Sequence, residues 1–111
     1  METEIFSLAD RVAIVTGAAR GLGRTLAQGL ADQGARVVLG DLNTEGARQA
    51  AAGIRAVGGQ AAGTHVDVAD PESCEALVRF AVAEFGRVDV LVNNAGIDII
   101  EPVGEVSAEA W

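Results

Sequence analysis

The sequence predicts an α/β protein in which a parallel sheet carries helices on both faces. Short apolar runs rich in β-branched residues alternate with stretches of helical periodicity, in the order β-α-β-α-β-α-β. The connections are short, and parallel strands require helical crossovers of this kind. We therefore expect a Rossmann-type doubly wound parallel sheet that forms one domain over residues 1–111, truncated after its fourth strand and incomplete at its C-terminus.

The first strand and helix are defined by a buried run followed by a leucine stripe. Residues 12–16 (VAIVT) are apolar and mostly β-branched, typical of a strand buried on both faces. Residues 21–34 predict an amphipathic helix, and Gly34 stands where helices commonly end. The stripe consists of Leu22, Leu26 and Leu30.

The second strand and helix repeat this pattern. Residues 36–40 (RVVLG) form another apolar run, which leads into Asp41. Residues 43–57 carry apolar positions on one helical face, and two glycines follow them. This face consists of Ala47, Ala50, Ile54 and Val57.

The third helix lies between a weaker strand at residues 60–68 and a fourth strand at residues 88–92. It begins at Asp70-Pro71, which places Asp at the N-cap and Pro at the first helical position, and it ends at Gly86. A loop containing Pro102 and a new helix start at Ser107 complete the chain. The apolar face of the third helix consists of Leu77, Val78, Ala81, Val82 and Phe85.

Composition excludes several classes of protein. Sixteen acidic residues against eight basic ones, all arginine, give a net charge of −8, which argues against nucleic acids and anionic membranes as partners. The sequence lacks an apolar run of about 20 residues. Its first residues also lack signal-peptide features, so we expect a cytoplasmic protein. The lone Cys74 and His65 exclude a Cys/His metal cluster; we interpret them as a structural thiol and a surface histidine.

A glycine-rich segment, residues 16–23 (TGAARGLG), connects the first strand to the first helix. A phosphate placed there would meet backbone N–H groups and the positive end of a helix dipole. Gly17 permits the turn out of the strand, Gly21 lets a pyrophosphate approach the backbone, and Gly23 lets helix and strand pack closely. The alternative is that these are ordinary turn glycines in a chain that contains 14 of them.

An acidic residue in the right place favours the first interpretation. Asp41 follows the second strand, eighteen residues after Gly23, where a carboxylate accepts hydrogen bonds from an adenosine ribose. The sequence therefore predicts a dinucleotide site at the carboxyl ends of the strands.

Two motifs together resemble the short-chain dehydrogenase/reductase family. They are the segment TGAARGLG at residues 16–23 and the segment NNAG at residues 93–96, after the fourth strand. The spacing is similar to that of the compact members, because extended members would have a glycine at the position of Arg20. The resemblance covers essentially the whole chain and corresponds to the N-terminal, cofactor-binding portion of the family.

The resemblance implies a role for each residue of the glycine-rich segment. Gly17, Gly21, Leu22 and Gly23 would hold the cofactor pyrophosphate. Asp41 would select NAD, because a carboxylate bonds a free ribose diol and repels a 2′-phosphate. A base at the position of Arg20 occurs in NADP-preferring relatives, so NADP is the second candidate.

It also implies roles at two other strand ends. Asp67 and Val68 would meet the adenine ring, unless Asp67 is only a solvated strand end. Asn93, Ala95 and Gly96 would brace the sheet and line the nicotinamide ribose, in part simply as a turn that ends the strand.

The family transfers a hydride between the nicotinamide and an alcohol or ketone carbon. It uses a Tyr as general acid/base, a Lys that lowers the pKa of that Tyr, and a Ser. This chain contains no Tyr and no Lys, so no catalytic residue is assigned and we expect the chain alone to be inactive. We expect a small-molecule alcohol or ketone substrate, no metal, and a homo-oligomer or self-association through an open sheet edge at residues 88–92.

Two alternatives stay open. The chain is a stand-alone nucleotide-binding or assembly module without catalysis, or another chain supplies the catalytic half in trans. A catalytic Tyr and Lys on a co-purifying partner would support the second.

Overall fold

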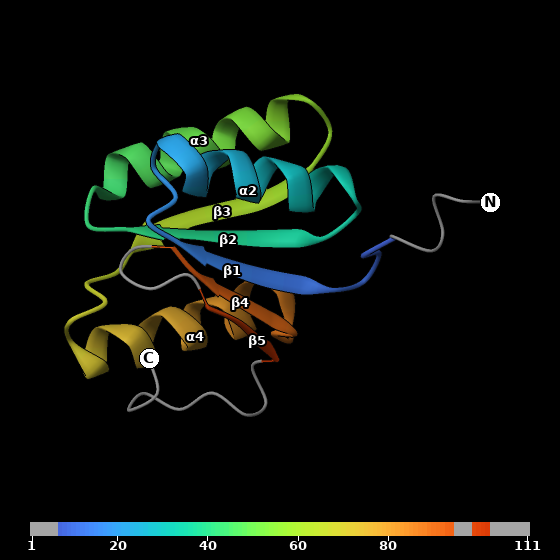
Figure 1. The fold of residues 1–111 in the computed structure, drawn as a ribbon. Helices are drawn as coiled ribbons and strands as arrows, with labels where there is room; N and C mark the ends of the chain where they lie inside the picture. The colour runs from blue at the N-terminus through green and yellow to red at the C-terminus, as the bar shows by residue number, and fades with distance from the viewer. Residues whose placement is uncertain (1–6, 95–98, 103–111) are drawn as a thin grey trace.

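The computed structural model describes residues 7–94 and 99–102 and shows a five-stranded sheet in the order β3-β2-β1-β4-β5 (Figure 1). Strands β1 to β4 are parallel, as predicted, and β5 runs antiparallel to β4. The elements are β1 (Val12–Thr16), α2 (Gly21–Asp32), β2 (Arg36–Asp41), α3 (Thr44–Ala56), β3 (Gln60–His65), α4 (Pro71–Phe85), β4 (Val90–Asn93) and β5 (Ile99–Pro102).

Helices cover both faces of the sheet. Figure 1 shows α2 and α3 on one face and α4 on the other. Neighbouring residues of β1 divide between the two cores: Val15 packs with the side of α2 and α3, and Ile14 with the side of α4. This division confirms that β1 is a strand buried on both faces.

The predicted helix ends lie within two residues of the observed ones, and the predicted N-cap at Asp70 is confirmed. The side chain of Asn43 accepts a hydrogen bond from Gly46 N–H at the start of α3, and that of Asp70 accepts one from Glu72 N–H at the start of α4. Gly34 and Gly86 follow α2 and α4 with left-handed φ angles of 101° and 86°.

The predicted apolar faces are wrong at three positions. Leu22 is 59% exposed, Val57 is 72% exposed and Val82 is 46% exposed. In α2 the buried residues are Gly23 and Ala27, and the predicted Leu26 and Leu30 are partly buried against the same core. Helical periodicity therefore predicted the elements and most of the buried positions of α3 and α4, but it also included one exposed residue in each predicted helix.

The prediction that the fourth strand is an open edge is also wrong. β5 pairs with β4, with Val92 opposite Ile100, and the segment expected to be a loop around Pro102 forms this strand. Proline is tolerated there because β5 is an edge strand. The predicted helix start at Ser107 lies outside the described residues.

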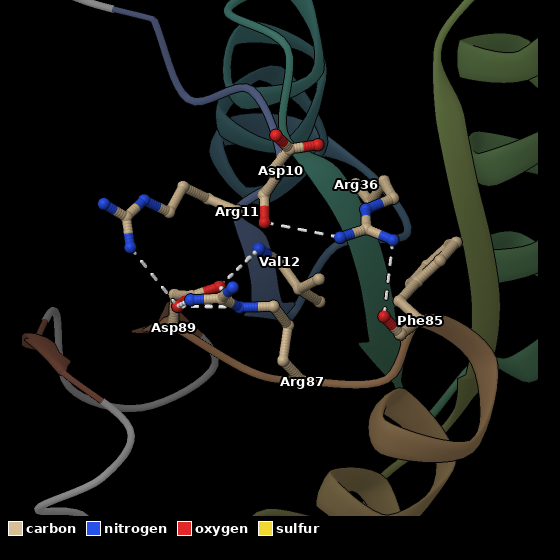
Figure 2. Close-up of polar contacts among 7 residues, drawn as sticks. All are labelled: Asp10, Arg11, Val12, Arg36, Phe85, Arg87 and Asp89. Carbon is tan, nitrogen blue, oxygen red and sulfur yellow. Dashed lines mark hydrogen bonds and ion pairs between the residues drawn. The ribbon is translucent and has the colours of Figure 1, made fainter.

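The amino ends of β1 and β4 are joined by a charged side chain (Figure 2). Asp89 accepts a hydrogen bond of 2.9 Å from Val12 N–H, so its carboxylate continues the pairing and β4 begins later than predicted. The Arg87 guanidinium donates to the same carboxylate at 2.6 Å, and Arg11 lies 3.6 Å from it. These hydrogen bonds hold the pKa of Asp89 below its usual value.

Within the described residues, none of the helices combines the length and the apolar character that a bilayer crossing needs.

Candidate functional site

The carboxyl ends of β1, β2 and β3 surround a cavity of about 230 Å³. This edge is opposite the one held by Asp89, and it is where open α/β sheets bind ligands. The cavity is smaller than the roughly 300–1,000 Å³ of complete ligand pockets, so it suits one end of a longer ligand. Its lining consists of Gly17, Asp41, Leu42, Val66 and Val68.

The structure requires glycine for different reasons at the three glycine positions of the glycine-rich segment. Gly17 and Gly21 adopt left-handed φ angles of 65° and 63°, which other residues rarely accept. A Cβ at Gly23 would lie 2.1 Å from the carbonyl oxygen of Gly17. A Cβ at Gly21 would meet nothing within 4 Å, so this side of the loop is open to an approaching group.

The amino end of α2 is suited to an anion. Its N-cap residue, Arg20, makes no side-chain capping hydrogen bond, and its first turn contains no acidic residue. By contrast, the first turns of α3 and α4 contain Glu45 and Glu72, and both helices have side-chain caps. The free N–H groups at the start of α2 and the positive end of its dipole are therefore available to an anion, because the first turn of the helix contains no carboxylate that would compete.

Asp41 points back toward the glycine-rich segment. One carboxylate oxygen accepts a hydrogen bond of 3.1 Å from Ala19 N–H, and the other accepts one of 2.9 Å from Asn43 N–H. The side chain is thereby fixed at the rim of the cavity. Carboxylate oxygens have lone pairs beyond these two bonds and can accept further donors from a ligand.

The two asparagines at the carboxyl end of β4, Asn93 within the strand and Asn94 directly after it, hold the strand end and the glycine-rich segment. Asn93 is 5% exposed and accepts a 2.9 Å hydrogen bond from the Thr16 hydroxyl, so it braces β4 against β1. Asn94 donates from its side-chain nitrogen to the carbonyl oxygen of Gly17 at 3.3 Å. The sequence analysis missed Asn94; its place beside Asn93 in the NNAG segment was the only signal. Ala95 and Gly96 lie outside the described residues.

The turn after β3 contributes apolar side chains to the cavity. Val66 and Val68 line it, together with the 68% exposed Leu42 from the end of β2. Asp67 is not among the described residues that line the cavity, and its carboxylate accepts a hydrogen bond from Ala69 N–H at 3.0 Å. Leu42 and Val66 were missed, although an apolar residue directly after Asp41 was a visible signal.

Cys74 and His65 have the environments expected of residues without a chemical role. Cys74 is buried, and burial raises the pKa of its thiol to about 11, helped by the carboxylates of Asp70 and Asp67. The thiol is therefore protonated at neutral pH. His65 is exposed at the end of the edge strand β3. Across residues 7–94 and 99–102, no group of three or more His, Cys, Asp or Glu residues is placed to hold a metal ion.

A larger hollow of about 530 Å³ lies between α2 and α3. Arg24, Gln28 and Asp32 of α2 line it, and Gly53 lies on the α3 side. It contains none of the residues predicted for a site and is lined by helix residues, so the smaller cavity is the candidate site.

The fold and this edge define a class, the Rossmann-type α/β proteins with a glycine-rich turn between β1 and the next helix. A family model described as short chain dehydrogenase matches residues 11–111. The chain therefore belongs to the short-chain dehydrogenase family.

Individual relatives agree with the family model. The chain is 44% identical over 106 residues to D-threitol dehydrogenase of Mycolicibacterium smegmatis, covering 96% of this chain and 41% of that protein. It is 53% identical over 94 residues to L-rhamnose 1-dehydrogenase (NAD(P)(+)) of Azotobacter vinelandii, covering 81% of this chain and 37% of that protein. It is also similar to the crystal structure of hydroxysteroid dehydrogenase from Escherichia coli, with a TM-score of 0.77 and 38% identity over 79% of this chain and 37% of that chain. The chain thus spans about two fifths of the relatives that it matches.

Proposed function

We propose that this chain is the NAD-binding part of an oxidoreductase that transfers a hydride between NAD(H) and an alcohol or ketone. The observation that carries the proposal is the geometry of Asp41, whose carboxylate lies at the cavity rim and is fixed toward the glycine-rich segment. The same edge has an open backbone face at Gly21 and the uncapped start of α2. These features fit the ribose and pyrophosphate of a dinucleotide.

Each part of the cofactor has residues that suit it. The backbone at Gly21, Leu22 and Gly23 would bind the pyrophosphate, and Asp41 would accept hydrogen bonds from the adenosine ribose. Leu42 and Val68 would contact the adenine ring. When bound, the nicotinamide supplies the carbon that gives or accepts the hydride.

The preference for NAD follows from charge. A 2′-phosphate close to the Asp41 carboxylate is repelled, whereas a free ribose diol donates to it. Arg20 lies exposed at the start of α2 and would attract a phosphate, so NADP is the second candidate. The relative named for NAD(P)(+) supports keeping both.

The acid/base chemistry needs residues that this sequence does not contain. Without Tyr or Lys, the chain has no phenol or ammonium to move the proton of an alcohol, so we propose that the chain alone binds a cofactor and is inactive. The substrate class, alcohol or ketone, is supported by relatives named as threitol, rhamnose and hydroxysteroid dehydrogenases. We further propose a cytoplasmic homo-oligomer.

Isothermal titration calorimetry with NADH and NADPH tests the proposal. We expect the wild-type chain to prefer NADH, and Asp41→Asn to weaken NADH binding about tenfold or more, because a charge-assisted hydrogen bond is lost. NADPH binding should weaken less or improve. Glu84→Gln removes an exposed charge of the same size from α4 and should change neither affinity. Absence of binding, or equal loss for both cofactors in Asp41→Asn, would overturn the assignment.

One observation favours a second candidate, a stand-alone nucleotide-binding module. β5 covers the edge of β4, so within the described residues the sheet does not end on the interior strand. The intact mass of the natural protein separates the two. A mass well above 11.3 kDa supports the oxidoreductase, and a mass equal to that of these 111 residues supports the module.

A further inference from the structure

Helix α3 packs against the glycine-rich segment at Gly46, in the first turn of the helix. A Cβ built at Gly46 would lie 2.9 Å from the Cβ of Ala19 and 2.7 Å from the side-chain nitrogen of Asn43. Separations under 3.0 Å are essentially never seen for real Cβ atoms. The Asn43 side chain is held by the capping hydrogen bond from Gly46 N–H, and the Cβ of Ala19 moves only with the backbone, so a methyl group at residue 46 would press on both. Ala19 therefore occupies its position because residue 46 has no side chain.

Ala19 is one of the two residues whose backbone N–H groups orient Asp41; the other is Asn43. Its N–H donates to the Asp41 carboxylate at 3.1 Å, near the long end of the usual range for this kind of hydrogen bond. A displacement of Ala19 by a few tenths of an ångström, away from α3, would lengthen or bend this bond. Gly46, Ala19 and Asp41 thus form a chain of contacts from α3 to the cavity rim.

We infer that Gly46 is a positioning residue, which sets the orientation of the Asp41 carboxylate through Ala19 and so tunes the discrimination between NAD and NADP. The inference rests on the proposed function. It assigns no ligand contact to Gly46; the residue acts only through the loop that it supports.

The same helix provides a matched control at Gly53. A Cβ at Gly53 would meet only the Arg24 guanidinium, at 3.5 Å, which is an ordinary van der Waals contact. Gly46→Ala and Gly53→Ala both place the better helix former in α3. The two variants differ in whether the new methyl group pushes against Ala19 and Asn43.

The experiment compares NADH and NADPH binding in the full chain. We expect Gly46→Ala to weaken NADH binding by about tenfold, as for loss of one well-oriented charged hydrogen bond, and NADPH binding by much less. Gly53→Ala should leave both affinities unchanged. Ala19→Gly combined with Gly46→Ala removes the contact with Ala19 and keeps the one with Asn43. If the effect passes through Ala19, the double variant should have a higher NADH to NADPH preference than Gly46→Ala alone. An equal loss for both cofactors, or no loss, would overturn the inference.

A measurement without cofactor separates this inference from the proposed function. Hydrogen exchange at the Ala19 amide, followed by NMR, should speed up in Gly46→Ala and not in Gly53→Ala, because only the first disturbs the bond to Asp41. If the wild type binds neither cofactor, the proposed function fails, and the Ala19 exchange rate still decides whether Gly46 positions the loop. Unchanged exchange in Gly46→Ala would show that α3 moves instead, and the inference would fail.

Discussion

Gly23 controls how closely α2 approaches the glycine-rich segment. The atom that a side chain there would strike is the carbonyl oxygen of Gly17, 2.1 Å from the Cβ position, and a backbone atom cannot rotate away. Gly29, further along the same helix, has nothing within 4 Å of its Cβ position. The two glycines in one helix therefore have opposite tolerances.

This difference predicts opposite effects of alanine. Gly23→Ala is expected to lower the free energy of unfolding by about 1–3 kcal/mol, because the added methyl group forces a backbone shift. Gly29→Ala is expected to raise it by about 0.5–1 kcal/mol through helix propensity. Urea unfolding followed by circular dichroism measures both. If both variants changed stability in the same direction, the packing explanation would be wrong.

Residues of the glycine-rich segment and Asp41 were predictable because their spacing reflects local geometry. Gly17 and Gly21 do adopt left-handed φ angles, and Asp41 does lie at the cavity rim. Asn94 was not predictable in the same way. Its hydrogen bond joins residues 77 positions apart and depends on the pairing of β4 with β1.

Among the elements, helix ends were easier to predict than helix faces. Capping by Asn43 and Asp70 involves neighbours in sequence, so the residue types alone indicate it. Which face of a helix is buried depends on the surface against which it packs, and Leu22 and Val57 are exposed for that reason. β5 was missed because its pairing depends on the free edge of β4 and not on a local pattern.

The start of β4 depends on Asp89. Its carboxylate binds Val12 N–H and Arg87, and these bonds favour the ionised form, so its pKa is lower in the folded protein than in the unfolded chain. A carboxyl group whose pKa is lowered by folding stabilises the folded state at pH values above its pKa in the unfolded chain, which is about 3.9. This contribution is lost as the pH falls through the pKa of the folded state.

The pH dependence of stability tests this role. Asp89→Asn is expected to melt at a lower temperature than the wild type at pH 7, and the difference should shrink as the pH falls from about 5 toward 2. Glu84→Gln, which changes an exposed side chain, serves as the control in the same scans. A difference between Asp89→Asn and the wild type that stayed constant with pH would exclude the ionised carboxylate as its source.

On the scale of the whole molecule, the amino ends and the carboxyl ends of the strands differ in what they contribute. At the amino ends of the strands, Asp89 and Arg36 join neighbouring elements. Arg36 donates to the carbonyl of Phe85 at 3.3 Å and lies 5.7 Å above its ring (Figure 2). The cavity and the glycine-rich segment lie at the carboxyl ends of the strands. Substitutions of Asp89 or Arg36 should change the free energy of unfolding with little effect on the proposed cofactor preference.

The two faces are covered unequally. Two described helices pack on one face and one on the other, where Val82 of α4 is 46% exposed. We expect the isolated chain to self-associate, although not through an open edge of β4, because β5 covers that edge. Analytical ultracentrifugation over a range of concentrations measures this. A monodisperse monomer that melts cooperatively would contradict the expectation.

The hydrogen bonds that Asn93 accepts from Thr16 and that Asn94 donates to Gly17 also have a consequence for protein synthesis. The glycine-rich segment emerges early from the ribosome, but the side chains that hold it belong to a strand made 77 residues later. A nascent chain that ends before β4 contains the glycine-rich segment and Asp41 without the two hydrogen bonds that join β4 to this segment. These bonds can therefore form only after β4 has been made.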